Sequence, residues 1–315
     1  MQLDSQKHFI QSLANTVTSL NRKPIVFDSA IAQAPATCGE LIQGIKDDGP
    51  FLVNAPIPLF SIVRASITSK LGVRVIHLGI YTKIIRAIEF LLIDLELTNR
   101  VGVELQVLTH IPRGKGLASS TSEISAALGA TLKALNLKKD PSYIAHIIHQ
   151  VEANDAVYYP FISMVNQDTG LLYASYIAQI PLGFLLMDTG GEVLTDEISR
   201  KDELQYKKNH EGFYKRAIDV LPEAFEQKDL NKLSELFTKS AKINQGYHKK
   251  EIFDDVLKVA LSEGALGVNC AHTGTLLGVM YDIRRPYLHI KQKLLELVEE
   301  SSILGSYQLC HGGIQ

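Results

Sequence analysis

The sequence predicts an α+β fold built from two domains. Residues 101–112 alternate between apolar and polar side chains, as a half-buried strand does, and residues 123–135 repeat apolar side chains at helical spacing. Strand-like and helix-like segments are mixed along the chain without strict β-α-β alternation, which favours α+β over a doubly wound sheet. With 315 residues the chain is long for a single core, so about two domains are expected.

The first half of the chain contains strand candidates around a glycine-containing segment. Residues 25–28 predict a short strand, and residues 34–44 form a compact segment with a proline and two glycines. Residues 51–78 contain further strand-like pieces, and residues 80–94 have helical spacing. The predicted strand, turn and helix of residues 101–135 follow.

Helices dominate the second half of the chain. Asp140 is expected to cap a helix that has Pro141 in its first turn and ends near residues 152–155. Residues 161–188 are strand-like again. The remaining predicted elements are helices near 203–220, 222–240 and 250–263, a strand–loop–strand at 267–281, a helix at 286–300 and a short terminal strand.

Composition excludes several classes of protein. Lys and Arg number 32 against 34 Asp and Glu, a net charge of -2, and no basic stripe points to nucleic acid as the partner. The most apolar run, 90–97, is short and contains acids, so no membrane span is predicted. The polar leader 1–23 lacks the layout of a secretory signal. The 3 cysteines are widely spaced and contain no CxxC pair, which predicts reduced thiols in a cytoplasmic protein without structural zinc.

The turn at residues 112–122 has the features of a phosphate-binding site. Gly114 and Gly116 lie between the predicted strand and helix, where the absence of a Cβ lets the backbone approach an anion. The first turn of the helix is rich in hydroxyl groups, and its N–H groups have no helical partner. Taken alone, the segment fits a phosphate site and an ordinary capped helix equally well.

Several common motifs are absent from the chain. No Walker A run GxxxxGK[ST] and no GxSxG nucleophile elbow occur, and the dinucleotide pattern GxGxxG fails at Ser119. His146, His149 and Glu152 are spaced along one predicted helix and suggest metal ligands. Their directions drift by about 60° per step at 3.6 residues per turn, so the three side chains do not share a centre. Partly exposed polar residues on an amphipathic helix explain them better than zinc.

Three segments resemble the motifs of the GHMP kinase superfamily, in that family's order and approximate spacing. The second motif, Pro-x-Gly-x-Gly-Leu-Gly-Ser-Ser, is matched at Pro112, Gly114, Gly116, Leu117, Ser119 and Ser120, with Ala118 in place of a glycine. Residues 34–44 resemble the first motif, and residues 271–278 resemble the third, which is glycine-poor here. Within the superfamily, Pro-x-x-Cys-Gly-Glu-Leu-x-Gln-Gly and Lys-Gly-x-Ala-Ser-Ser-Thr look most similar to the L-threonine kinases of cobalamin synthesis.

The resemblance implies the two-domain GHMP kinase fold. Its N-terminal domain, of the ribosomal S5 domain 2-like kind, would cover residues 24–170, and its ferredoxin-like C-terminal domain would cover residues 171–315. The leader 1–23 has no counterpart and stays unassigned. The resemblance also implies ATP and Mg²⁺ as cofactors.

By the same resemblance, the second motif holds ATP. The implied cofactor-binding residues are Pro112, Gly114, Lys115, Gly116, Leu117, Ala118, Ser119, Ser120 and Thr121. Ser120 would supply an oxygen to Mg²⁺, and Glu152 is the carboxylate paired with it, because a hard cation prefers oxygen ligands. Glu123 competes for this role, or else serves as a favourable charge at the helix N-terminus. Lys115 either reaches a phosphate or lies in solvent.

On the acceptor side, the resemblance implies Asp155 and Ser120 as catalytic residues. Asp155 would accept the proton of the acceptor hydroxyl or orient that hydroxyl for in-line attack. The implied substrate-binding residues are Thr37, Cys38, Gly39, Glu40, Gln43, Thr273 and Gly274. Glu40 suits an ammonium group, and thus an amino acid better than a sugar. Cys38 is expected to pack rather than to act as a nucleophile, because no nearby feature would lower its pKa.

These observations lead to one functional hypothesis with two alternatives. The first is an ATP-dependent kinase that phosphorylates the side-chain hydroxyl of an amino acid, L-threonine before others. The second keeps the kinase and changes the acceptor to homoserine, serine or another hydroxy amino acid. The third is a non-catalytic member that binds a nucleotide or metabolite. The oligomeric state is not readable from the sequence.

Overall fold

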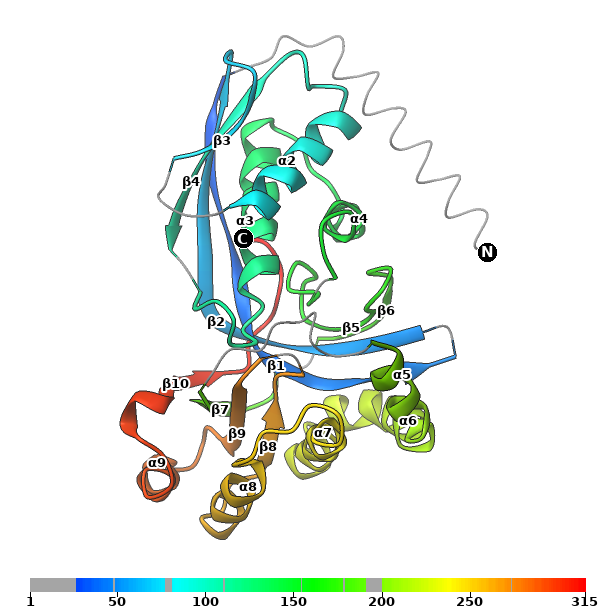
Figure 1. Cartoon of the computed structure of the whole chain (residues 1–315), viewed down its shortest axis with the longest axis vertical. Coiled ribbons are helices and arrows are strands. Elements are labelled where there is room, and N and C mark those ends of the chain that lie inside the picture. Colours follow the sequence, from blue (N-terminus) through cyan, green and yellow to red (C-terminus); the bar gives the residue numbers. More distant parts are fainter. Residues whose placement is uncertain are drawn as a thin grey trace.

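The computed structural model in Figure 1 describes residues 27–47, 49–76, 81–109, 111–153, 155–177, 179–190, 200–272 and 274–315. The leader 1–23 and Thr273 of the third motif therefore lie outside the described residues.

Two long strands run through the whole molecule. β1 (Ser29–Lys46) and β2 (Gly49–Thr68) pair antiparallel and extend from the upper into the lower half of Figure 1. They lie within a 10-stranded sheet of order β10-β7-β9-β8-β1-β2-β4-β3, with β5 and β6 paired beside β2. The other strands are β3 (Gly72–Val75), β4 (Gly102–Thr109), β5 (Ile162–Asn166), β6 (Leu172–Tyr176), β7 (Leu182–Asp188), β8 (Gly267–Cys270), β9 (Leu276–Asp282) and β10 (Ile303–Gln308).

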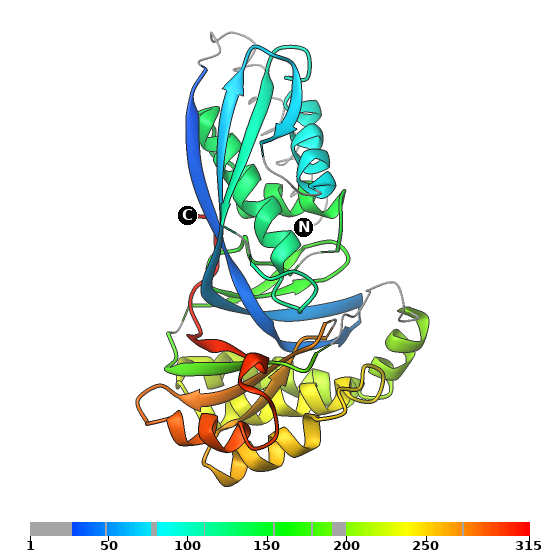
Figure 2. The same cartoon turned by 60° about the vertical axis from the view of Figure 1, so that its left-hand side comes forward.

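In the upper half, three helices cover one face of the sheet, as Figure 2 shows. They are α2 (Thr82–Asp94), α3 (Ser119–Ala134) and α4 (Pro141–His149). α3 packs directly on β1 and β2, with α2 and α4 against its outer side. Its small residues and central position leave it buried on nearly every side, as expected for a helix between two layers. The N-terminus of α3 is thereby fixed beside the sheet.

In the lower half, both faces of β7 and β9 are buried. Along β7, Phe184 and Leu186 join the core formed with α6 and α7, whereas Leu185 and Met187 face the core formed with α8. This is the alternation expected of a strand with period two. The helices here are α5 (Arg200–Lys208), α6 (Glu211–Glu226), α7 (Leu230–Asn244), α8 (Phe253–Ser262) and α9 (Leu288–Leu294).

The predicted α+β class is confirmed, whereas some predicted boundaries are wrong. Residues 34–44 are not a separate compact segment, because they lie within β1, where bulges interrupt the pairing with β2. The helix expected to start at Pro222 starts at Leu230, and Pro222 lies inside α6. The break falls at Lys228, which has a φ of +55°, and at Asp229, which caps α7 by accepting from the N–H of Lys232.

Within the described part of the chain, no helix combines the length and the apolar character needed to cross a bilayer.

One buried amide joins the two halves of the sheet. β1 meets β8 at a single register pair, Glu40 with Cys270. Beside it, Asn269 Nδ2 donates to the carbonyl of Cys38 over 2.6 Å, and Asn269 Oδ1 accepts from Cys38 Sγ over 3.6 Å. Asn269 has no exposed surface, so its hydrogen bonds replace water entirely.

Asn269→Ala should lower the free energy of unfolding by about 1–3 kcal/mol, because it leaves the buried carbonyl of Cys38 without its donor. Urea denaturation measures this loss. Asn231→Ala, at an exposed position of α7, is the matched control and should change stability by less than about 0.5 kcal/mol. Equal losses in the two variants would contradict the role given to Asn269.

Candidate active site

The turn before α3 has the backbone of an anion-binding loop. Gly114, Gly116 and Ala118 have φ values of +73°, +88° and +57°, and the residues between them do not have positive φ. Such alternation turns successive N–H groups toward one side. Ala118 is the N-cap of α3 and forms no side-chain cap, so the first N–H groups of the helix are left to a ligand.

Ala118 occupies the position where the motif has glycine, and its left-handed backbone explains why glycine suits that position. An alanine there carries about 1–2 kcal/mol of strain. The chain keeps the loop conformation in spite of this cost, because the carbonyl of Ala118 accepts from the N–H and the hydroxyl of Ser122.

Directly after the loop, two hydroxyls meet two carboxyls. Ser120 Oγ donates to Glu152 Oε2 over 2.7 Å, and Lys83 Nζ lies 2.6 Å from the same oxygen. Thr121 Oγ1 lies 2.9 Å from Glu152 Oε1 and 3.1 Å from Asp155 Oδ2, so it bridges the two carboxyl groups. Oxygen atoms from α3 and from the loop after α4 therefore gather at one point beside the phosphate loop.

Glu123 lies in the same region but is engaged differently. Arg113 Nη2 donates to both of its carboxylate oxygens, over 3.0 Å and 2.8 Å. The Arg113 guanidinium also lies over the ring of Tyr81, 5.0 Å from its centre. These residues line a cavity of about 340 Å³ together with Lys83, Gly114, Ser119 and Ser120. The hydroxyl of Ser120 donates to Glu152, whereas both oxygens of Glu123 accept from Arg113.

Asp155 is held where its ionisation is disfavoured. Loss of solvation, followed by the charges of Glu40 and Glu152, raises the pKa of its carboxyl to about 7. The loop carrying it is anchored by Asn54, whose Nδ2 donates to the carbonyl of Ala156 over 2.9 Å. Asp155 Oδ1 takes part in none of the hydrogen bonds found among the described residues. Near neutral pH, Asp155 can therefore hold or release a proton.

Glu40 forms a second buried acid, beside the third motif. Its Oε2 accepts from the backbone N–H of His272 over 3.0 Å and lies 2.8 Å from His272 Nδ1. Burial raises the pKa of Glu40 to about 7 and holds the pKa of His272 well below its usual value. His272 is therefore neutral, and its contact with Glu40 assigns the ring proton to Nδ1. Nε2 then remains a buried acceptor without a partner among the described residues.

The third motif lies directly against the phosphate loop. Gly274 has a φ of +112°, and a Cβ there would come within 2.6 Å of the backbone nitrogen of Gly116. Lys115 Nζ forms an ion pair with Asp188 Oδ2 over 2.8 Å, and Asp188 also accepts from the hydroxyl of Thr275. Lys115 thus ties the loop to the end of β7 and is not a freely solvated side chain.

The first motif supports the same arrangement from below. The N–H of Thr37 donates to the carbonyl of Leu117 over 3.1 Å. Gly39 has a φ of +55°, and a Cβ there would lie 2.6 Å from the nitrogen of Ala271. The thiol of Cys38 is fully buried, and burial raises its pKa well above the usual value. Gln43 is also buried and donates to Gln167 Oε1.

The remaining predicted residues lie along the loop itself, where Pro112 is exposed and Ser119 is partly buried. Thr273 falls outside the described residues.

Sequence reasoning did not single out Lys83, Arg113 or Lys250 for the site, and it noted Asp188 only as part of a stretch similar to the L-threonine kinases. Arg113 lies inside the second motif, but that pattern leaves its position open. Lys83 meets Glu152 across a sequence separation of 69 residues, so no local pattern could identify the contact. His272 was recognised as part of the third motif, yet its hydrogen bond to Glu40 emerges only when the two motifs fold together.

Asp155→Asn should stabilise the protein more at high pH than at low pH. Because the folded pKa of about 7 lies above the ordinary value of 3.8, wild-type stability is lost as pH rises toward and through 7. The neutral amide avoids this loss, so the gain in unfolding free energy should be about 2–3 kcal/mol larger at pH 8 than at pH 5.

Urea denaturation at the two pH values measures the effect, with Asp219→Asn, at an exposed position of α6, as the control. A gain that did not change with pH would be inconsistent with a raised pKa.

Comparison with known proteins agrees with this geometry. Residues 82–159, which include the phosphate loop, Glu152 and Asp155, match the GHMP kinases N terminal domain family. The L-threonine kinase of Salmonella typhimurium is 25% identical over 269 residues, covering 85% of this chain and 88% of the relative. The L-threonine kinase of Citrobacter freundii is 26% identical over 257 residues, covering 81% of this chain and 88% of the relative.

Solved structures share the fold at low identity. Mevalonate diphosphate decarboxylase from Staphylococcus aureus superposes with a TM-score of 0.70 at 15% identity, covering 92% of this chain and 98% of that one. Homoserine kinase from Cytophaga hutchinsonii gives 0.68 at 18% identity, covering 91% and 97%. The GHMP kinase fold that the motifs implied is thereby confirmed. Residues 82–159 carry the GHMP kinase N-terminal domain, and together with the similarity to two kinases over most of the chain this indicates an ATP-dependent phosphotransferase.

Proposed function

We propose that the protein transfers the terminal phosphoryl group of ATP to the side-chain hydroxyl of a small amino acid, with L-threonine as the first candidate. The observation that carries the proposal is the cluster of Ser120, Thr121, Glu152 and Asp155 beside the phosphate loop. Similarity to two L-threonine kinases over most of the chain supports the choice of acceptor.

The donor side suits ATP and Mg²⁺. Backbone N–H groups of the loop and of the first turn of α3 would hold phosphate oxygens, since three positive-φ residues turn them to one side. Ser120 Oγ and Glu152 Oε2 form an oxygen pair of the kind Mg²⁺ prefers, and Lys83 Nζ already supplies positive charge there. When bound, ATP would supply the phosphoryl group, and Mg²⁺ would neutralise the negative charge of the phosphates.

The acceptor side needs a base and a group that holds the amino acid. Asp155 Oδ1 would take the proton of the acceptor hydroxyl, which a pKa of about 7 permits near neutral pH. Thr121 keeps the carboxyl in place through Oδ2. Glu40, whose charge raises the pKa of Asp155, would hold the ammonium group of the substrate.

The setting of the reaction is part of the same proposal. We assign it to cobalamin biosynthesis, the role of the kinases that the motifs resemble. A cytoplasmic location is supported by Cys38, Cys270 and Cys310, all of which are free thiols.

Glu152→Gln should raise the Mg²⁺ concentration for half-maximal turnover by at least about 10-fold, because it removes a metal-ligand charge. The measurement is the rate of ADP release against Mg²⁺ at saturating ATP. Glu123→Gln is the matched comparison, and it should shift the Mg²⁺ dependence much less, since Arg113 already occupies that carboxylate. The reverse order of effects would assign the metal carboxylate to Glu123.

An acceptor panel tests the function itself. ADP release with L-threonine, homoserine, serine and no acceptor should be fastest with L-threonine, and both Asp155→Asn and Ser120→Ala should slow it by about 100-fold or more. Preference for homoserine or serine would change the acceptor and keep the kinase. Nucleotide binding by calorimetry without turnover on any acceptor would instead favour a non-catalytic member, and near wild-type rates in both variants would refute the site.

A further inference from the structure

Two lysines are buried among the described residues, and they differ in their partners. Lys207 forms an ion pair with Glu203. Lys250 is only 6% exposed, yet no carboxylate of the described residues lies within ion-pair distance of its ammonium group. Among these residues its Nζ donates one hydrogen bond, to the carbonyl of Ala271 over 2.7 Å. An ammonium has three donors, so the described part of the chain does not use all of them.

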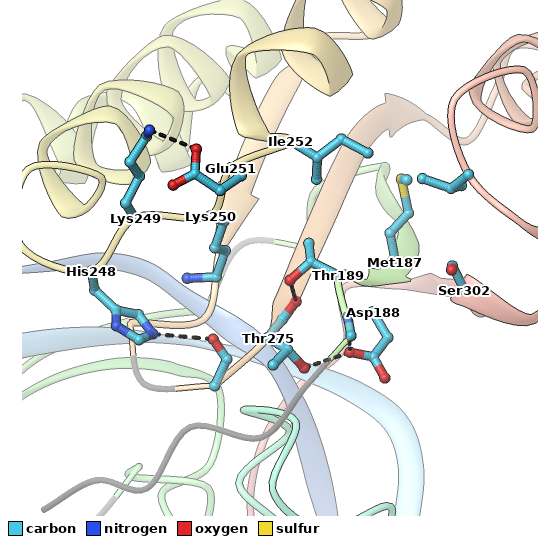
Figure 3. Close-up of a pocket in the computed structure, with 13 residues that line it drawn as sticks. Met187, Asp188, Thr189, His248, Lys249, Lys250, Glu251, Ile252, Thr275 and Ser302 are labelled. Atoms are coloured by element: carbon cyan, nitrogen blue, oxygen red, sulfur yellow. Dashed lines mark hydrogen bonds and ion pairs between the residues drawn. The ribbon is translucent and has the colours of Figure 1, made fainter. Parts of the chain in front are cut away.

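Lys250 also lines a cavity next to the phosphate loop. The cavity measures about 320 Å³, and its walls include Asp188, Gly274 and Thr275. Figure 3 shows the ammonium group of Lys250 on the side of His248, whereas Lys249 points away and pairs with Glu251. Neighbouring lysines in one loop are therefore used differently, and only Lys250 brings its charge to the third motif.

Glu40 approaches the same segment from the opposite strand. Its Oε2 takes both hydrogen bonds from His272, the residue after the carbonyl that Lys250 contacts. Glu40 Oε1 accepts no hydrogen bond within the described part of the chain. His272 Nε2 is a buried acceptor without a partner there. A buried acid with free acceptor capacity thus lies close to a buried ammonium with free donors.

Glu40 interacts electrostatically both with Asp155 and with Lys250. Glu40 contributes to the raised pKa of Asp155, and Lys250 acts on the pKa of Glu40 in the opposite direction. Burial lowers the pKa of Lys250, because the charged ammonium is poorly solvated there. A negatively charged ligand beside it would compensate for the lost solvation. Glu40 therefore lies within electrostatic reach of both Asp155 and Lys250.

We propose that Lys250 binds the α-carboxylate of the acceptor while Glu40, assisted by His272, binds its ammonium group. This inference rests on the proposed kinase function and narrows its substrate class to free amino acids, with both charged groups unmodified. A hydroxyl on the side chain would then be directed to Asp155. Lys250 becomes a specificity-determining residue that no motif marks.

Analogues that each lack one charge test the proposal. 1-Amino-2-propanol lacks the carboxylate of threonine, and 3-hydroxybutyrate lacks its ammonium group. Lys250→Met should lower kcat/KM for L-threonine by about 100-fold, the loss of a buried charge-assisted hydrogen bond, and lower that for 1-amino-2-propanol far less. Glu40→Gln should show the converse selectivity, with L-threonine strongly affected and 3-hydroxybutyrate little affected.

Lys249→Met is the matched control, because its exposed side chain pairs with Glu251, and it should leave both acceptors unchanged. Thermal melting of each variant verifies folding, and Lys250→Arg, which keeps the charge, should recover part of the discrimination. Equal losses with threonine and 1-amino-2-propanol in Lys250→Met would overturn the proposal. Wild-type enzyme without turnover on any hydroxy amino acid would overturn the proposed function instead, so the two failures are distinguishable.

Discussion

The bulged stretch of β1 between Pro35 and Ile42 is the constraint on which the site depends. A regular strand would alternate its side chains between two faces. Here the register of β1 against β2 shifts at three places, which interrupts that alternation. Thr37 reaches the carbonyl of Leu117 before the phosphate-loop helix, and Glu40 reaches His272 in the third motif. One strand segment thus holds the donor loop and the C-terminal loop in fixed relation.

The three motif segments pack so closely that two positions require glycine. Gly39 lies against Ala271, and Gly274 lies against Gly116, each with no room for a Cβ. The glycines of the first and third motifs are therefore required for contact between chain segments as much as for contact with a ligand. Lys115 and Asp188 add an ion pair across the same junction, so the phosphate loop is supported from both halves of the molecule.

The acidic residues of the site differ in their electrostatic surroundings. Glu152 accepts hydrogen bonds from Ser120 and Thr121 and pairs with Lys83, which suits a carboxylate that binds a cation. Asp155 and Glu40 instead have pKa values raised to about 7, because they are poorly solvated and near other carboxyls. The raised pKa values of Asp155 and Glu40 suit proton exchange near neutral pH.

Those features of the fold and the site that depend on residues close in sequence were predictable. The glycines of the phosphate loop, the strand–turn–helix around it and the α+β class all follow from spacing and backbone requirements. The partners of Glu152 and Glu40 were not predictable, because Lys83, His272 and Lys250 reach the site from distant segments. The boundary near Pro222 failed for a different reason. The helix continued through that residue and ended where Lys228 adopts a left-handed backbone.

Phosphorus NMR of the product tests the central claim most directly. The protein, Mg²⁺, ATP and L-threonine should yield ADP and one new phosphate ester whose signal couples to the β-proton of threonine, which identifies O-phospho-L-threonine. Formation of inorganic phosphate alone, or a phosphate signal coupled to no threonine proton, would contradict the account.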